Sequence, residues 1–125
     1  MNIEDFREYC LSLPGTTEGT PFEKFSKGKF TILVFYVNGH MYCYFNIDDF
    51  SAITIKCEPE RIAQLKERYM AVTEPYNGNK KHWISITLHA DMPDNEILDL
   101  VRNSHHLVQR IPASRKKQEI IQHST

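Results

Sequence analysis

The chain has 125 residues, of which 41% are hydrophobic and 25% are charged, and its formal net charge at pH 7 is −1. This size and composition predict one globular domain that can bury a core without metals or disulfides. The near-neutral balance excludes a global basic field for nucleic acid, so any such binding must depend on local patches. The longest apolar run, residues 32–37, is too short to span a membrane, and the acidic N-terminus is unlike a signal peptide. We therefore expect a cytoplasmic protein.

The cysteines and histidines predict neither a disulfide framework nor a metal centre. Cys10, Cys43 and Cys57 are odd in number, widely spaced and without a Cys-x-x-Cys pair, which favours free, buried thiols. His105 and His106 are adjacent, so a helix would point them in different directions. No His-Glu-x-x-His motif or carboxylate pair at ligand spacing occurs. We expect no metal and no cofactor.

Three segments carry helical patterns. Asn2 suits the N-cap of a first helix, and Pro14-Gly15 ends it. A second helix is expected to open at Glu58-Pro59, and a third within residues 91–93, with Pro112 closing it. Apolar or small residues at helical spacing form the inner faces: Ile3, Phe6, Cys10 and Leu13, then Ile62, Leu65 and Tyr69, then Ile97, Leu100, Val101, Ser104 and Val108.

The remaining patterned segments predict strands. Residues 30–37 and 41–46 flank Asn38-Gly39, the strongest short signal of a hairpin with a two-residue turn. Residues 52–56 continue this meander, and residues 82–88 form a further strand. Residues 16–29 form a loop in this interpretation, with an optional short strand at 22–26. The prediction is an α+β fold in the order α-β-β-β-α-β-α, with helices on one face of an antiparallel sheet of about four to five strands.

Strand alternation assigns side chains to the two faces of this sheet. A two-residue turn pairs Phe35 with Tyr42 and Val34 with Cys43. The expected core face carries Ile32, Val34, Tyr36, Met41, Cys43, Phe45, Ile53, Ile55, Ile84, Ile86 and Leu88. The expected open face carries Leu33, Phe35, His40, Tyr42, Tyr44, Thr54, Lys56, Trp83, Ser85 and Thr87. The open face is the candidate working surface, although Tyr and Thr also occur on solvated sheet faces because of β propensity alone.

One domain accounts for residues 1–112 in this interpretation. The remainder, residues 113–125, is a basic tail that contains Arg115-Lys116-Lys117. We expect the tail to be either a frayed helix or disordered.

The most informative motif is the run Asn79-Lys80-Lys81-His82-Trp83 at a loop-to-strand junction. It places two lysines and a histidine beside the only tryptophan, and Lys56 is expected nearby on the sheet. An aromatic ring next to cations can stack on a base while the lysines contact phosphates. A lysine pair in a loop is more commonly a solvated surface feature. By alternation, His82 should lean toward the helices, where its side chain could tie down the loop, and Trp83 should lie on the open face.

The sequence contains no recognisable catalytic constellation. Cys43 falls on the expected core face, and Ser104 beside His105 is a neighbour pair on a helix and not a relay. No glycine-rich phosphate loop occurs among the five glycines. We expect a protein that is not an enzyme.

Several motifs in a fixed order resemble the MmcQ/YjbR family of small bacterial proteins. They are Leu13-Pro14-Gly15-Thr16-Thr17-Glu18 with Pro21-Phe22, Ile55-Lys56-Cys57-Glu58-Pro59-Glu60, Asn79-Lys80-Lys81-His82-Trp83-Ile84, and Ser104 with Leu107-Val108. Two positions depart from the family pattern: Glu23 replaces a glycine, and His105 replaces an aromatic residue. The resemblance implies an α+β fold similar to frataxin-like and secretion-chaperone-like domains, and a "double-wing" DNA-binding label. It implies no catalytic residue and no cofactor.

The leading functional prediction is a non-enzymatic binding module for DNA, with a favoured monomeric state and no membrane association. Its expected partner-binding residues are Lys56, Lys80, Lys81, His82, Trp83, Tyr42 and Tyr44. The first alternative is a protein-binding or chaperone-like adaptor that uses the face of Phe35, Tyr42 and Tyr44. The second is a small-molecule binder or enzyme with a pocket near Trp83. Salt dependence separates the first two, because phosphate contacts weaken steeply with ionic strength.

Overall fold

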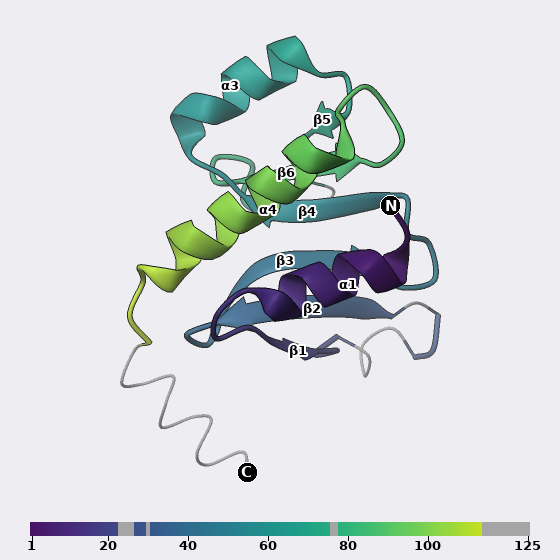
Figure 1. Ribbon diagram of the computed structural model, residues 1–125, viewed down its shortest axis with the longest axis vertical. Helices are drawn as coiled ribbons and strands as arrows, with labels where there is room; N and C mark the ends of the chain where they lie inside the picture. The colour runs from purple at the N-terminus through teal and green to yellow at the C-terminus, as the bar shows by residue number, and fades with distance from the viewer. Residues whose placement is uncertain (23–26, 30, 76–77, 114–125) are drawn as a thin grey trace.

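An antiparallel sheet in the order β1-β2-β3-β4-β6-β5 forms the centre of the fold (Figure 1). The computed structural model describes residues 1–22, 27–29, 31–75 and 78–113. Within them the strands are β1 (Thr17–Gly19), β2 (Ile32–Val37), β3 (His40–Asn46), β4 (Ala52–Lys56), β5 (Val72–Thr73) and β6 (Trp83–Thr87). The helices are α1 (Ile3–Ser12), α3 (Pro59–Arg68) and α4 (Asp94–Gln109). The predicted α+β class is confirmed.

The element order agrees with the prediction except for two short edge strands. Both β1 and β5 lie at the sheet margins and were not predicted as strands at these positions. β5 has only two residues, too few for a period-two pattern to show in the sequence. The predicted strand at 22–26 and the tail from residue 114 lie outside the described residues.

Helix α1 begins and packs as its sequence predicts. The Asn2 side chain accepts a hydrogen bond from the backbone N–H of Asp5 at 2.8 Å, which caps the helix. Phe6 is fully buried and packs edge-on against Phe35 and Phe45 in the sheet. α1 therefore anchors one half of the sheet through an aromatic cluster.

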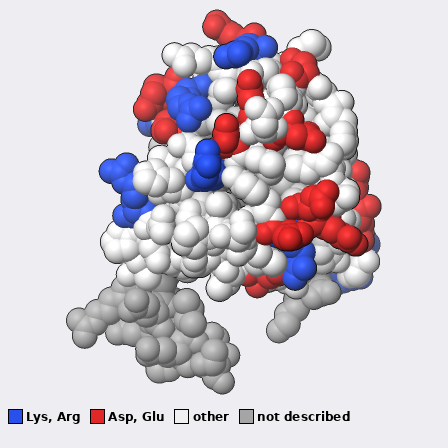
Figure 2. All heavy atoms as spheres, viewed as in Figure 1, with Lys and Arg blue, Asp and Glu red and all other residues white. Residues whose placement is uncertain are grey.

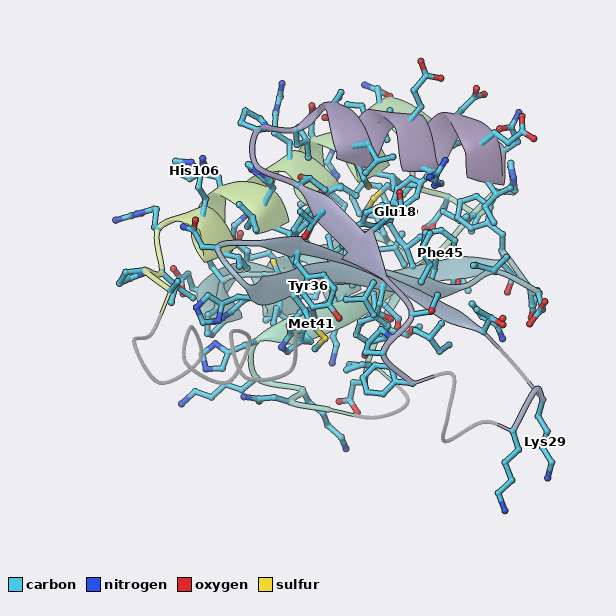
Figure 3. The ribbon with its side chains drawn as sticks, turned by 90° about the horizontal axis from the view of Figure 1, so that it is seen from below. Glu18, Lys29, Tyr36, Met41, Phe45 and His106 are labelled. Atoms are coloured by element: carbon cyan, nitrogen blue, oxygen red, sulfur yellow. The ribbon has the colours of Figure 1, made fainter. Side chains whose placement is uncertain are left out.

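Helix α4 covers the same face of the sheet. Ile97, Leu100, Val101, Ser104 and Val108 are all buried, as the helical spacing predicts, and His105 is buried with them. Figure 3 shows α1 and α4 on one side of the sheet, with Glu18 and Phe45 beneath α1. Tyr36 and Met41 lie on the other side, which we call the opposite face.

The β2–β3 hairpin forms with the predicted turn but continues in a different register. Asn38 and Gly39 both have positive φ, 54° and 77°, as a type I′ turn requires. The first pairs, Val37 with His40 and Tyr36 with Met41, are as predicted. A β-bulge then makes Tyr42 an extra residue, so that Phe35 pairs with Cys43 and not with Tyr42.

The bulge reverses several face assignments that the sequence analysis made. Leu33, Phe35 and Tyr42 face the helices, where the prediction placed them on the open face. Ile32, Val34, Tyr36 and Met41 lie on the opposite face, where the prediction placed them in the helix-covered core. Cys43, Phe45 and Tyr44 lie on the predicted faces, and Phe35 takes the place beside Cys43 that the prediction gave to Val34.

The β4–β6 ladder has the predicted faces throughout. Ile53, Ile55, Ile84 and Ile86 are fully buried in the core cluster. Their neighbours on the opposite face pair as Thr54 with Ser85 and Lys56 with Trp83. The three cysteines are free and buried, as expected. In the part of the chain that the structure describes, no helix combines the length and apolar character needed to cross a bilayer.

Candidate functional site

A tight turn before β6 positions the tryptophan. The carbonyl of Asn79 accepts hydrogen bonds from the backbone N–H groups of His82 at 3.2 Å and Trp83 at 3.0 Å. The Asn79 side-chain oxygen accepts another from the N–H of Lys81 at 2.9 Å. The N–H of Cys57, just past β4, donates to the carbonyl of His82 at 2.8 Å. The turn is thus fixed both internally and against the end of β4.

Trp83 lies on the opposite face beside an aromatic neighbour, where the sequence analysis expected it. Its ring centroid is 5.9 Å from that of Tyr44 in β3, with the two planes tilted by 41°. Both side chains are half-buried, so part of each ring is accessible. Lys56 is the cross-strand partner of Trp83 and shares its face. We call Tyr44, Lys56, Lys80, Lys81 and Trp83 the basic-aromatic surface.

Hydroxyl groups flank Tyr44 on the same face. Thr54 and Ser85 share a side-chain hydrogen bond of 2.9 Å across β4 and β6. Burial raises the pKa of Tyr44, while its hydrogen bond to Thr54 acts in the opposite direction. The phenol is therefore neutral at physiological pH, and the two rings present an uncharged stacking surface between lysines.

The three lysines of this surface differ in their electrostatic partners. Lys80 forms an ion pair with Glu74, with its Nζ 3.3 Å from Oε2. Lys81 is exposed and Lys56 is half-buried, and neither pairs with a carboxylate among the described residues. No carboxylate of the described residues therefore competes with a ligand for Lys56 or Lys81.

Tyr42 does not belong to the basic-aromatic surface, and its predicted placement there is wrong. Its side chain is fully buried under the helices because of the bulge in β3. The hydroxyl donates to the carbonyl of Cys10 at 3.2 Å and shares a 3.0 Å hydrogen bond with Thr16. Burial raises its pKa well above the usual range of a tyrosine. Tyr42 is a core residue that joins β3 to the end of α1.

His82 is held by its backbone. Its N–H and C=O groups make the turn and β4 contacts given above. The predicted side-chain hydrogen bond that would tie down the loop is not formed within the described residues. His82 thus fixes the turn through its backbone groups, and its imidazole is half-buried.

Ser104 and His105 have structural partners. The Ser104 hydroxyl donates to the carbonyl of Tyr42 at 2.5 Å and accepts from the N–H of Lys56 at 2.9 Å. It thus bridges β3 and β4 beyond the point where their ladder ends. A ring nitrogen of His105 lies 2.7 Å from the carbonyl of Pro14. Each of the two side chains is thus hydrogen-bonded to backbone groups. A nucleophile–base relay would instead need a hydrogen bond between the two side chains.

Glu58 fixes the segment that follows β4. Its Oε1 accepts a 2.8 Å hydrogen bond from the Asn103 side chain and lies 3.7 Å from the Arg61 guanidinium. Burial acts to raise the pKa of Glu58, but hydrogen bonds from the backbone and Asn103 outweigh it and lower the pKa. Hydrogen bonds from Asn103 to Glu58, from Lys56 to Ser104 and from Cys57 to His82 thus join three of the motifs noted in the sequence.

Sequence reasoning missed the ion-pair cluster in which Glu74 joins Lys80 to Lys66. Glu74 and Lys66 lie in different elements from the turn, and their spacing in the sequence carries no helical or strand signal that would group them. Asn79 belongs to the motif that the sequence analysis singled out, but its role in fixing the turn was not predicted, although asparagine favours turns through its side chain. Among the residues that the structure describes, no three His, Cys, Asp or Glu side chains are grouped to hold a metal.

Comparisons with known proteins agree with this fold and with the motifs. A family model described as YjbR matches residues 11–107. The chain is 23% identical over 123 residues to the uncharacterized protein YjbR of Escherichia coli K12, covering 98% of this chain and 99% of the relative. It is 27% identical to the uncharacterized protein YyaQ of Bacillus subtilis 168 over 116 residues, covering 86% and 98%.

Two solved structures have the same overall fold. A Deinococcus radiodurans protein with a DUF419 domain superposes with a TM-score of 0.78 at 28% identity, covering 94% of this chain and 86% of that one. A Pseudomonas syringae protein superposes with a TM-score of 0.67 at 25% identity, covering 86% and 99%. The descriptions of these proteins state no activity or ligand.

Proposed function

The chain belongs to the YjbR family, and from this premise we propose that it is a non-enzymatic module that binds single-stranded nucleic acid. The observation that carries the proposal is the half-exposed Trp83–Tyr44 pair with Lys56 and Lys81 beside it. Bases stack on such rings, while lysines contact the phosphates of the same strand. DNA and RNA share this chemistry, and the experiment below separates them.

The distribution of charge supports a single strand over a duplex. Duplex recognition uses a helix or ribbon in the major groove and many phosphate contacts. Figure 2 shows acidic side chains gathered over α1 and mixed signs over α3 and α4. The exposed acidic residues of α1 are Glu4, Asp5 and Glu8. The acidic surface of α1 would therefore repel a duplex, whereas the basic-aromatic surface can hold a few nucleotides of a single strand.

The placement of Phe35 and Tyr42 bears on the alternative of a protein-binding face. Both were predicted to form that face with Tyr44, and both are fully buried. Only Tyr44 of the three is accessible, and it contacts Trp83. The accessible residues that remain, Tyr44 and Trp83 with their neighbouring lysines, therefore support nucleic acid better than a protein as the partner.

Trp83 provides a direct test because it is the only tryptophan. Labelled oligothymidine and oligouridine strands of about 15 nucleotides, and a matched duplex, are titrated while indole quenching and label anisotropy are recorded. We expect quenching by single strands, binding that weakens steeply between about 50 and 200 mM salt, and weaker duplex binding.

Two variants test the role of the surface. Trp83→Ala should reduce affinity about 5-fold to 150-fold, which corresponds to roughly 1–3 kcal/mol for one stacked base. Leu11→Ala, an exposed change on α1, is the matched control and should bind as the parent does. Absence of binding at low salt, or equal binding by both variants, would overturn the proposal.

A further inference from the structure

A single carboxylate at the sheet edge holds two lysines from different elements. Glu74, which follows β5, accepts from Lys66 of α3, with Nζ 3.2 Å from Oε1. Its other oxygen, Oε2, lies 3.3 Å from Nζ of Lys80 in the turn before β6. Hydrogen bonds from Lys66 and Lys80 lower the pKa of Glu74, so the carboxylate is ionised at physiological pH.

The geometry of this cluster matches the way a phosphate would be held. A phosphodiester group presents two negatively charged oxygens to cations, as the Glu74 carboxylate does to Lys66 and Lys80. All three side chains are substantially exposed, and ion pairs of this kind contribute little to stability. Exchange of the carboxylate for a phosphate therefore needs only side-chain rotation and leaves the fold intact.

The cluster adjoins the stacking surface through the turn itself. Lys80 lies between Asn79 and Trp83, whose backbone groups are joined by a 3.0 Å hydrogen bond. Lys66 approaches the same carboxylate from α3, which contacts β5 at the sheet edge. Lys80 thus belongs both to the turn that positions Trp83 and to the cluster around Glu74.

We infer that Lys66 extends the basic-aromatic surface by forming a phosphate-binding site together with Lys80, and that Glu74 weakens this site by pairing with both lysines. The inference rests on the proposed function and deepens it, because it assigns a new contact residue, Lys66, and a residue that sets affinity. With Glu74 in place the cluster carries a net charge of +1, and without that carboxylate it carries +2.

The test compares Glu74→Gln with a matched control. Glu67→Gln removes the same charge from an exposed position of α3 next to Lys66, and Glu67 forms no ion pair within the described residues. For oligothymidine, each added phosphate contact steepens the salt dependence of log K by about 0.7. Glu74→Gln should therefore steepen the slope by about 0.7–1.4 and tighten binding about fivefold to tenfold at 50 mM salt.

Reversal identifies the lysines responsible. Adding Lys66→Gln and Lys80→Gln to Glu74→Gln should abolish the gain in slope and affinity. If the parent binds in a Trp83-dependent manner but Glu74→Gln behaves like Glu67→Gln, the inference fails while the proposed function stands. If neither the parent nor Glu74→Gln binds at low salt, the proposed function itself fails.

Discussion

Tyr42 and Tyr44 lie two residues apart in β3 and have opposite roles. Tyr42 is fully buried under the helices, with its ring 6.3 Å from Phe35 and 5.2 Å from His105. Tyr44 lies half-buried on the opposite face against Trp83. Residues two apart in a regular strand share a face, so only an irregularity can separate these two. The bulge at Tyr42 supplies it.

This difference between the two faces predicts which substitutions should change stability and which should change ligand affinity. The helix-covered face is a fully hydrogen-bonded core, in which buried side-chain nitrogen and oxygen atoms of the described residues all have partners. The opposite face keeps aromatic and cationic groups accessible. Changes on the first face should affect the free energy of unfolding, and changes at the accessible aromatic and cationic residues of the second should affect ligand affinity.

Tyr42→Ala should have the largest effect. It removes a fully buried ring and should lower the free energy of unfolding by about 3–5 kcal/mol. Urea denaturation followed by far-ultraviolet circular dichroism measures the loss. Tyr42→Phe keeps the ring and removes only the hydroxyl contacts to Thr16 and Cys10, so it should cost about 1–2 kcal/mol. A Tyr42→Ala protein as stable as the parent would contradict the assignment of Tyr42 to the core.

Ser104→Ala should have the next effect on stability. It removes the bridge between the Tyr42 carbonyl and the Lys56 N–H, and leaves both backbone groups without this partner. We expect a loss of about 1–3 kcal/mol in the free energy of unfolding. Ser104→Cys should recover part of it, because a thiol of similar shape is a weak donor and acceptor. Full stability in Ser104→Ala would show that the strands close the gap themselves.

The sequence predicted the helices and the side-chain faces of β4 and β6 because their patterns are unambiguous. Isoleucines alternate with Thr54, Lys56, Trp83 and Ser85, so only one face can be the core. β2 reads Ile-Leu-Val-Phe-Tyr-Val, which is apolar at every position. Alternation cannot choose a face there, and the choice depended on a register that the bulge shifts by one residue.

The candidate site was predictable to a similar extent. Trp83 and Lys56 lie together because β4 pairs with β6. The sequence analysis expected Lys56 nearby on the sheet but did not predict this pairing of strands. Tyr42 was assigned to the wrong face because the sequence did not show the β-bulge. The Lys66–Glu74–Lys80 cluster depends on how α3 sits beside β5, a tertiary contact with no local signal.

Trp83→Ala sharpens the comparison by separating binding from folding. It should weaken oligonucleotide binding by about 1–3 kcal/mol. Its cost in unfolding free energy should be smaller than that of Tyr42→Ala, because Trp83 is only half-buried. Circular dichroism is the required probe, since the variant has no tryptophan. If Trp83→Ala loses as much stability as Tyr42→Ala, the ring is a core anchor and the opposite face is not a binding surface.

Asp91 provides the smallest expected effect and lies in a third region, away from the basic-aromatic surface. Its carboxylate accepts hydrogen bonds from the backbone N–H groups of Met70 at 2.7 Å and Ala71 at 2.8 Å, and that of Met70 is the main cause of its lowered pKa. A carboxyl whose pKa is lowered by folding stabilises the fold above its ordinary value of 3.8, and this contribution is lost as pH falls through the folded pKa. Asp91→Asn should therefore be slightly less stable than the parent at neutral pH, and the difference should close below that value. Oligonucleotide affinity should not change. A stability difference that persists in acid would mean that Asp91 stabilises the fold by its shape and not by its charge. A change in oligonucleotide affinity would contradict the separation between the residues that stabilise the fold and the surface that binds the ligand.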